Sequence, residues 1–265
     1  MELKEILSLN AEGLIPGPGE SEEAFKKRVE KTKATITREL GAEWHWASEQ
    51  LRQLFDFSPR WCAISRSKRG LTPWQAAATW IDENQVCSIQ LNPSRFVQWL
   101  VDQKEIVSHE AAHAARAAFD EPHFEELFAY LTADRAWRRV LGPLFRTPRE
   151  ALFLLGFCLF GASTQLIELS MGCLLFSQGW FLLALLSIFF WSLRLFRSRI
   201  RLQRAYQQLA PLVRDPTKIR AVLFRLTDHE IETLARGDRI EAPNELRWDL
   251  IKAAYLRDDV GLWLN

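Results

Sequence analysis

The sequence predicts an α+β protein with a small sheet among soluble helices and a helical hairpin that crosses a membrane. Two observations lead to this prediction. Strand-like segments are confined to residues 61–93, whereas the sequence on either side shows the apolar spacing of helices. Residues 150–196 are almost free of charge and long enough for two helices that span a bilayer.

Residues 1–60 are expected to form a helical N-terminal region. The proline and glycine residues at positions 15–19 cannot hold regular structure and should separate two helices. The second helix is predicted to start at Ser21, which two glutamates follow, and to run to about Phe55 with a kink near Gly41.

Residues 61–148 are expected to form the soluble core, beginning with three short strands. These strands are predicted at 61–66, 75–81 and 86–91, and turn-forming sequence separates them. We expect a small antiparallel sheet that ends at residues 92–94.

Two helices are predicted between residues 95 and 140. The first ends in an alanine-rich run at Phe119. Residues 120–122 are expected to break this helix, because Pro122 lacks an amide donor and disfavours helix in the residue before it. The second helix should start there and continue past Trp137.

The first of these helices carries the clearest chemical signal. His109 and His113 are four residues apart, a spacing that puts both imidazoles on one face of a helix, where they can share a metal ion. Glu110 lies about 100 degrees around the helix from His109, beside such an ion. A zinc ion with an open position acidifies its water, and a neighbouring carboxylate can take the proton. We therefore expect Zn²⁺ as the cofactor, bound by both histidines, with Glu110 as the general base.

The segment HEAAH at 109–113, followed by Glu126 and Ala129, resembles the glutamate-type zincins, or gluzincins. This resemblance implies a zincin-like fold in which Glu126 is the third zinc ligand. Several membrane members of that group carry a Glu-x-x-Ala-Asp signature on the second helix. Tyr130 stands where that signature has aspartate, so the partner that orients a zinc-binding histidine is not identified. The resemblance covers residues 60–140.

Other side chains compete for roles in this site. Glu125 is an alternative third ligand, and His123 is a further candidate that is more simply explained as an exposed helix-start residue. His45 and His229 are expected to be structural. The candidates for stabilising an oxyanion are the tyrosines at 130, 206 and 255. A peptide substrate is expected to add as a strand along the segment 75–79, whose small side chains leave room, although an ordinary buried strand explains this segment equally well.

The apolar stretch at 150–196 is predicted to contain spans at about 151–169 and 172–193. The first span has one charge, Glu168, and the second has none. Arginines flank both spans: Arg135, Arg138, Arg139, Arg146 and Arg149 before the first, and Arg194, Arg197, Arg199, Arg201 and Arg204 after the second. The positive-inside rule then puts both termini and the active site on the cytoplasmic side of the bilayer. The alternative is a buried helical hairpin in a soluble protein.

Residues 203–265 are expected to be a cytoplasmic helical tail with three helix starts. Pro216 follows Asp215 at a first helical position, residues 227–230 form a capping-box sequence, and Pro243 opens a last segment.

Composition excludes some classes of partner and site. The chain has 34 basic and 33 acidic residues, so no charge excess favours nucleic acid. Its four cysteines form no CxxC pair, which favours free thiols in a reducing compartment over a disulfide framework or a thiolate zinc site. The first 25 residues lack the apolar core of a signal peptide, so we expect the front of the chain not to be exported.

These features together predict a membrane-anchored zinc metalloprotease, an endopeptidase acting on membrane-associated polypeptides. Two alternatives remain open: a non-catalytic membrane adaptor that keeps a zincin-like fold as a scaffold, and a zinc hydrolase of a non-peptide amide.

Overall fold

The computed structural model describes residues 1–34, 42–72, 75–82, 86–94, 102–172, 177–240 and 242–257. The chain divides into two compact units. The first combines Met1–Arg139 with Arg201–Asn265, and the second is Val140–Ile200. The predicted N-terminal region, soluble core and C-terminal tail therefore belong largely to one unit.

Three helices open the first unit: α1 (Leu3–Ala11), α2 (Glu22–Ala34) and α3 (Ala42–Phe55). The predicted break after α1 is confirmed, because residues 14–17 have no regular structure. The long helix expected from Ser21 to Phe55 is two helices, and the predicted kink at Gly41 lies outside the described residues.

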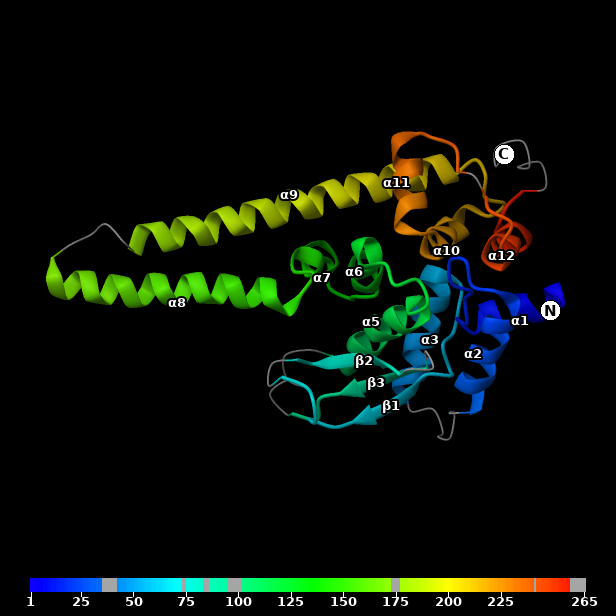
Figure 1. The fold of residues 1–265 in the computed structure, drawn as a ribbon, viewed down its shortest axis with the longest axis horizontal. Coiled ribbons are helices and arrows are strands. Elements are labelled where there is room, and N and C mark those ends of the chain that lie inside the picture. The colour runs from blue at the N-terminus through cyan, green and yellow to red at the C-terminus, as the bar shows by residue number, and fades with distance from the viewer. Residues whose placement is uncertain are drawn as a thin grey trace. The chain divides into compact units, whose positions relative to one another are not determined.

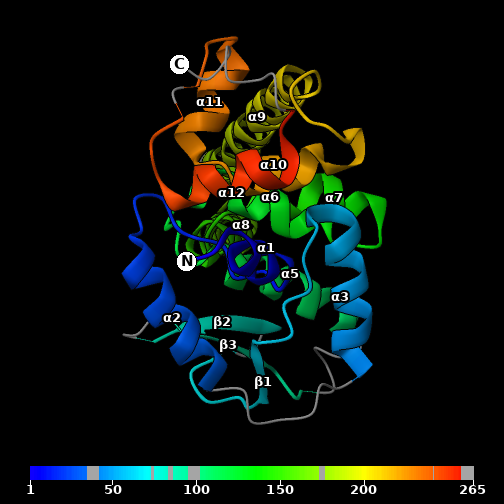
Figure 2. The ribbon, with the colours of Figure 1, turned by 90° about the vertical axis from the view of Figure 1, so that its right-hand side faces the viewer.

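The sheet consists of β1 (Ala63–Arg66), β2 (Ala77–Ile81) and β3 (Cys87–Leu91) in the order β1-β3-β2, as Figure 2 shows. The prediction of an antiparallel sheet is wrong in part: β2 is antiparallel to β3, but β1 is parallel to it.

The connection between β1 and β2 explains this difference. It leads to β2 at the other edge of the sheet. Because the chain reverses direction between β1 and β2 and again between β2 and β3, β1 and β3 run in the same direction. Gln90 in β3 holds the start of the connection, because its amide nitrogen donates 2.8 Å hydrogen bonds to the backbone oxygens of Ser67 and Arg69. Alternating side chains in a strand record which face is buried but not the direction of the neighbouring strand.

Helices α5 (Gln103–Arg116) and α6 (Pro122–Leu131) follow the sheet, and α7 (Ala136–Leu141) comes after them. Helix α5 packs against α3, α6 and β2 (Figure 1). Its alanines at 111, 112, 114 and 115 are buried, and such small side chains allow neighbouring elements to approach closely. Pro122 is at the start of α6, as predicted, but the prediction that this helix continues past Trp137 is wrong, because α6 ends at Leu131 and Trp137 belongs to α7. The first part of the helix expected from residue 95 lies outside the described residues.

The tail forms α10 (Ile219–Arg225), α11 (Asp228–Arg236) and α12 (Leu246–Tyr255). Helix α10 packs against α3, and α12 packs against α1 and α10. The capping box at the start of α11 is confirmed, with Thr227 and Glu230 each bonded to the other's backbone amide. Phe224 of α10 stacks on Phe55 of α3 at 4.4 Å and lies edge-on to Phe128 of α6 at 5.5 Å. The tail therefore contributes to the same hydrophobic core as the helices that carry the site.

The second unit is a helical hairpin. It contains α8 (Pro148–Met171) and the first part of α9 (Ser177–Leu209), and both helices are long and apolar enough to cross a membrane. Glu168 accepts hydrogen bonds from the backbone nitrogen and the hydroxyl of Ser177 at 2.7 and 2.5 Å. Arg194 forms a bidentate ion pair with Glu150 at the other end of the hairpin.

Many large apolar side chains of this hairpin are exposed in the chain by itself. They are Leu152, Phe153, Leu155, Leu159, Phe160, Leu166, Ile167, Leu169, Met171, Phe181, Leu182, Leu183, Leu185, Leu186, Ile188, Phe189, Phe190 and Phe196. A hairpin buried in a soluble protein would have most of such residues covered by protein, whereas here only 11% of the most apolar window of each helix is buried.

Candidate metal centre

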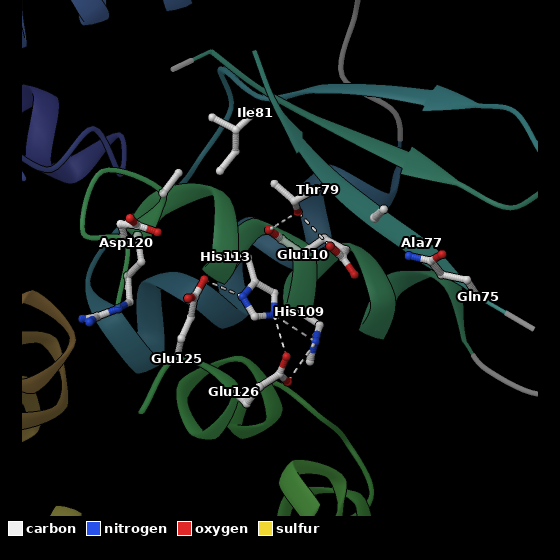
Figure 3. A pocket seen from close by; sticks show the side chains of 13 residues that line it. Gln75, Ala77, Thr79, Ile81, His109, Glu110, His113, Asp120, Glu125 and Glu126 are labelled. Carbon is white, nitrogen blue, oxygen red and sulfur yellow. Dashed lines mark hydrogen bonds and ion pairs between the residues drawn. The ribbon is translucent and has the colours of Figure 1, made fainter. Parts of the chain in front are cut away.

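Helix α5 presents His109 and His113 one turn apart on its side facing α6 (Figure 3). Their Nε2 atoms are 3.2 Å apart, and less than a fifth of either side chain is exposed. The two rings are therefore in contact with each other and largely buried.

Helix α6 adds Glu126 to the pair. Its Oε2 lies 3.8 Å from His109 Nε2, and its Oε1 lies 3.7 Å from His113 Nε2. One ligand atom from each of the three residues lies within 4.8 Å of the others, so together they could hold a metal ion. The structure thus brings together the three residues that the sequence indicated as ligands.

Glu125 has a different place from its neighbour. Its Oε1 accepts a 2.7 Å hydrogen bond from Nδ1 of His113, on the side of the ring that faces away from His109. This bond fixes the proton on Nδ1 and leaves Nε2 directed at the other two candidate ligands. The structure therefore places Glu125 behind the candidate ligand His113, a role that the sequence did not distinguish from direct ligation.

His109 is also held from behind. The backbone of Ala129 hydrogen-bonds its ring, and the ring of Tyr130 lies edge-on at 4.6 Å. A backbone group thus contributes to holding this ring. No sequence motif could have revealed this, because every residue has a carbonyl group.

The electrostatics of the pair favour a positive charge between the rings. Burial and the neighbouring His113 lower the pKa of His109 well below 6.5. Burial also acts to lower the pKa of His113, but the hydrogen bond to Glu125 and the charge of Glu126 outweigh it and raise this pKa to about 9. Without a metal, Nε2 of a protonated His113 can donate a hydrogen bond to Nε2 of a neutral His109. A metal cation between the two rings would instead accept a lone pair from the Nε2 atom of each.

Glu110 points to the sheet rather than to the three candidate ligands (Figure 3). Its Oε2 accepts a 2.7 Å hydrogen bond from the hydroxyl of Thr79 in β2. This carboxylate is therefore held between the helix and the edge strand, beside the histidines.

A cavity of about 370 Å³ opens in front of these groups. Its lining includes His109, Glu110, His113 and Glu126, and β2 forms one wall. A second cavity, of about 160 Å³, extends past His109 towards Ile106, Tyr130 and Arg138. Residues of the segment 75–79 line both cavities. The second half of this segment belongs to β2, which is an edge strand of the described sheet, as predicted.

The remaining histidines and tyrosines lie elsewhere. His45 is exposed on α3, and the side chain of His123 is 4.0 Å from Glu232 of α11. Tyr255 is buried and its hydroxyl accepts from Asn10. Of the three tyrosines, Tyr130 alone belongs to the described lining of either cavity.

The buried thiols are poor candidates for ligands. The thiols of Cys62 and Cys87 are buried, and burial raises the pKa of both, that of Cys87 to about 11. Such thiols stay protonated near neutral pH, whereas metals bind thiolates.

No family model, curated protein or solved structure matches this chain. Its function has to be inferred from the chemistry of these residues.

Proposed function

We propose that this protein is a membrane-anchored zinc peptidase. The observation that carries the proposal is the convergence of His109, His113 and Glu126, with Glu110 beside them in an open cavity. Two nitrogen ligands and one carboxylate are a donor set typical of catalytic zinc, which keeps its fourth position for water or substrate.

The geometry fits this ion. Tetrahedral zinc with bonds of about 2.0–2.2 Å places its ligand atoms roughly 3.3–3.5 Å apart. The distances here are 3.2 Å between the histidines and 3.7 and 3.8 Å from Glu126 to each of them. Glu125 bonds to His113 at the ring nitrogen away from His109, and the backbone of Ala129 hydrogen-bonds the ring of His109. Metal-binding histidines usually have such partners.

Zinc, when bound, would act as a Lewis acid that polarises a carbonyl group and makes water more acidic. Glu110 would accept a proton at its carboxylate, and Thr79 holds that carboxylate towards the cavity. Since a general base must lie within hydrogen-bond reach of the proton that it takes, the Thr79 contact has a direct role in its placement.

The edge strand supports a peptide as the substrate. Strand β2 has β3 on one side, and its small residues Ala77 and Ala78 line the cavity on the helix side. An extended peptide can add to such an edge through backbone hydrogen bonds. We infer that the bond to be cleaved is presented along β2.

The hairpin supports attachment to a membrane. Its exposed apolar side chains, the two long helices and the arginines on both flanks suggest two spans with both termini and the site on the cytoplasmic side. Helix α8 follows α6 closely in the chain, so we propose membrane-associated polypeptides as substrates.

Zinc content and zinc dependence test the proposal directly. The purified full-length protein is expected to contain about one zinc ion per chain, because three protein ligands converge on one point. A chelator should abolish cleavage of an unfolded polypeptide in a membrane-mimetic environment, and added zinc should restore it. A folded protein that lacks zinc and does not take it up would contradict the proposal and favour a non-catalytic adaptor.

Glu125→Gln is expected to weaken zinc binding by about 10–100-fold, because the amide does not supply the negative charge behind His113. Zinc affinity would be measured by competition with a chromogenic chelator. Glu49→Gln is a matched control, since Glu49 is exposed on α3 and interacts with Arg52 and Gln53 of the same helix. Equal affinity of both variants would show that the Glu125 contact has no part in metal binding.

A further inference from the structure

The N-termini of α6 and α11 cap each other. Helix α6 has no side-chain cap of its own, and Pro122 at its start lacks an amide. The next two amides, of His123 and Phe124, donate to Oδ2 and Oδ1 of Asp228 at 2.8 and 3.3 Å. In return, the amide of Asp228 donates to Oε2 of Glu121 at 2.7 Å. Residues more than a hundred positions apart thus satisfy each other's free helix amides.

Asp228 lies next to a buried hydrogen-bond network. It follows Thr227, the first residue of the capping box, whose partner Glu230 is buried. Both carboxylate oxygens of Glu230 accept from Arg247 at 2.8 Å, and one also accepts from the indole nitrogen of Trp248 at 2.7 Å. The cap therefore rests on a buried network within the tail.

Helix α5 is tied to the same part of the tail. Arg116, three residues after His113, is buried, and its Nη1 donates to the backbone oxygens of Phe224 and Leu226 at 2.5 and 3.1 Å. Its guanidinium also lies 5.2 Å from the ring of Phe128 in α6. The two helices that carry the candidate ligands are thus both attached to the turn between α10 and α11.

We propose that Asp228 is a positioning residue for the metal centre, which sets the place of α6 relative to α5 and thereby the carboxylates of Glu125 and Glu126. Those two glutamates directly follow the capped amides, in the first turns of a ten-residue helix. Loss of the cap would let this end of the helix fray. The inference rests on the proposed function, and it assigns a role to the tail that the local sequence of either helix does not show.

The test compares Asp228→Ala and Asp228→Asn with Asp215→Ala in the full-length protein. Asp215 caps the short turn before α10 through the amide and hydroxyl of Thr217. It is therefore a capping aspartate in the same tail, away from α6. Asp228→Ala is expected to weaken zinc binding by about 10-fold, near the lower end of the range for residues behind metal ligands. Asp228→Asn keeps an oxygen acceptor and should recover part of the affinity, and Asp215→Ala should match the native protein.

Two further readouts separate positioning from general destabilisation. Cobalt bound in place of zinc is expected to show an altered visible absorption spectrum in Asp228→Ala, because a shifted carboxylate changes the coordination. Hydrogen exchange, measured without metal, should become faster for the peptide that contains His123 and Phe124 and stay unchanged for α12.

Native zinc affinity, cobalt spectrum and exchange of α6 in Asp228→Ala would overturn the inference while leaving the proposed peptidase intact. Faster exchange throughout the first unit in both Asp228 variants would also overturn it, since the residue would then serve stability in general. If the native protein binds no zinc, the proposed function fails, while selective loss of protection in α6 still shows that Asp228 positions this helix.

Discussion

Glu110→Gln is expected to lower kcat/KM for peptide cleavage by about 10²–10⁴-fold while the zinc content stays at its native level. Glutamine has almost the same shape as glutamate and can still accept from Thr79, so the cavity should keep its form. The glutamine amide, however, cannot take a proton from water at neutral pH. Because Glu110 bonds to β2 and not to the three candidate ligands, its replacement should separate chemistry from metal binding.

The measurement pairs a fluorogenic peptide assay with metal analysis of the same sample. Glu5→Gln, an exposed position on α1, controls for the effects of losing one carboxylate from the surface. Zinc retained with activity lost supports the assignment of Glu110 as general base. Native activity in Glu110→Gln would end the proposal that this residue takes the proton, and loss of zinc would move Glu110 into the group that holds the metal.

Arg247→Met is expected to reduce the free energy of unfolding by about 3–5 kcal/mol, the largest stability effect that we predict for a single side chain. Arg247 and Glu230 are both buried, and their bidentate contact connects α12 to the start of α11. Methionine fills much of the space but leaves the carboxylate of Glu230 without its main cation. Removal of one partner from a buried ion pair costs more than the pair contributes, because the remaining charge stays in the interior.

The effect of this substitution should depend on pH. Burial acts to raise the pKa of Glu230, but the hydrogen bond and charge of Arg247 outweigh burial and hold this pKa below its usual value of 4.5. In the native protein the pair therefore contributes stability above about pH 4.5, and this contribution is lost as the pH falls through the lowered pKa. Without Arg247, protonation of Glu230 relieves a buried charge, so the difference between variant and native protein should shrink in acid.

Denaturant unfolding in detergent at pH 7 and near pH 4 measures both quantities. Arg236→Met is the control, since Arg236 is largely exposed on α11 and its replacement should change stability by less than about 0.5 kcal/mol. A loss in Arg247→Met no larger than in this control would show that the buried pair does not hold the tail in place.

Local patterns in the sequence determined much of this protein. Residues four apart on a helix share a face, so the spacing of His109 and His113 already placed two imidazoles together. The capping box at 227–230 and the apolar stretches of the hairpin were also readable, because helix caps and bilayer-length segments depend on neighbouring residues alone. Each of these features involves interactions within a few turns of one helix.

Only the tertiary structure decided the features that depend on distant partners. The parallel pairing of β1 with β3 arises because β2, which comes between them in the chain, lies at the other edge of the sheet. Which of Glu125 and Glu126 lies beside both histidines depends on how α6 packs against α5, since adjacent residues on a helix point about 100 degrees apart. The bond from Asp228 to α6 joins groups 104 and 105 residues apart. Alternation and spacing carry no information about such pairs, because the free energy that selects them comes from packing of the whole core.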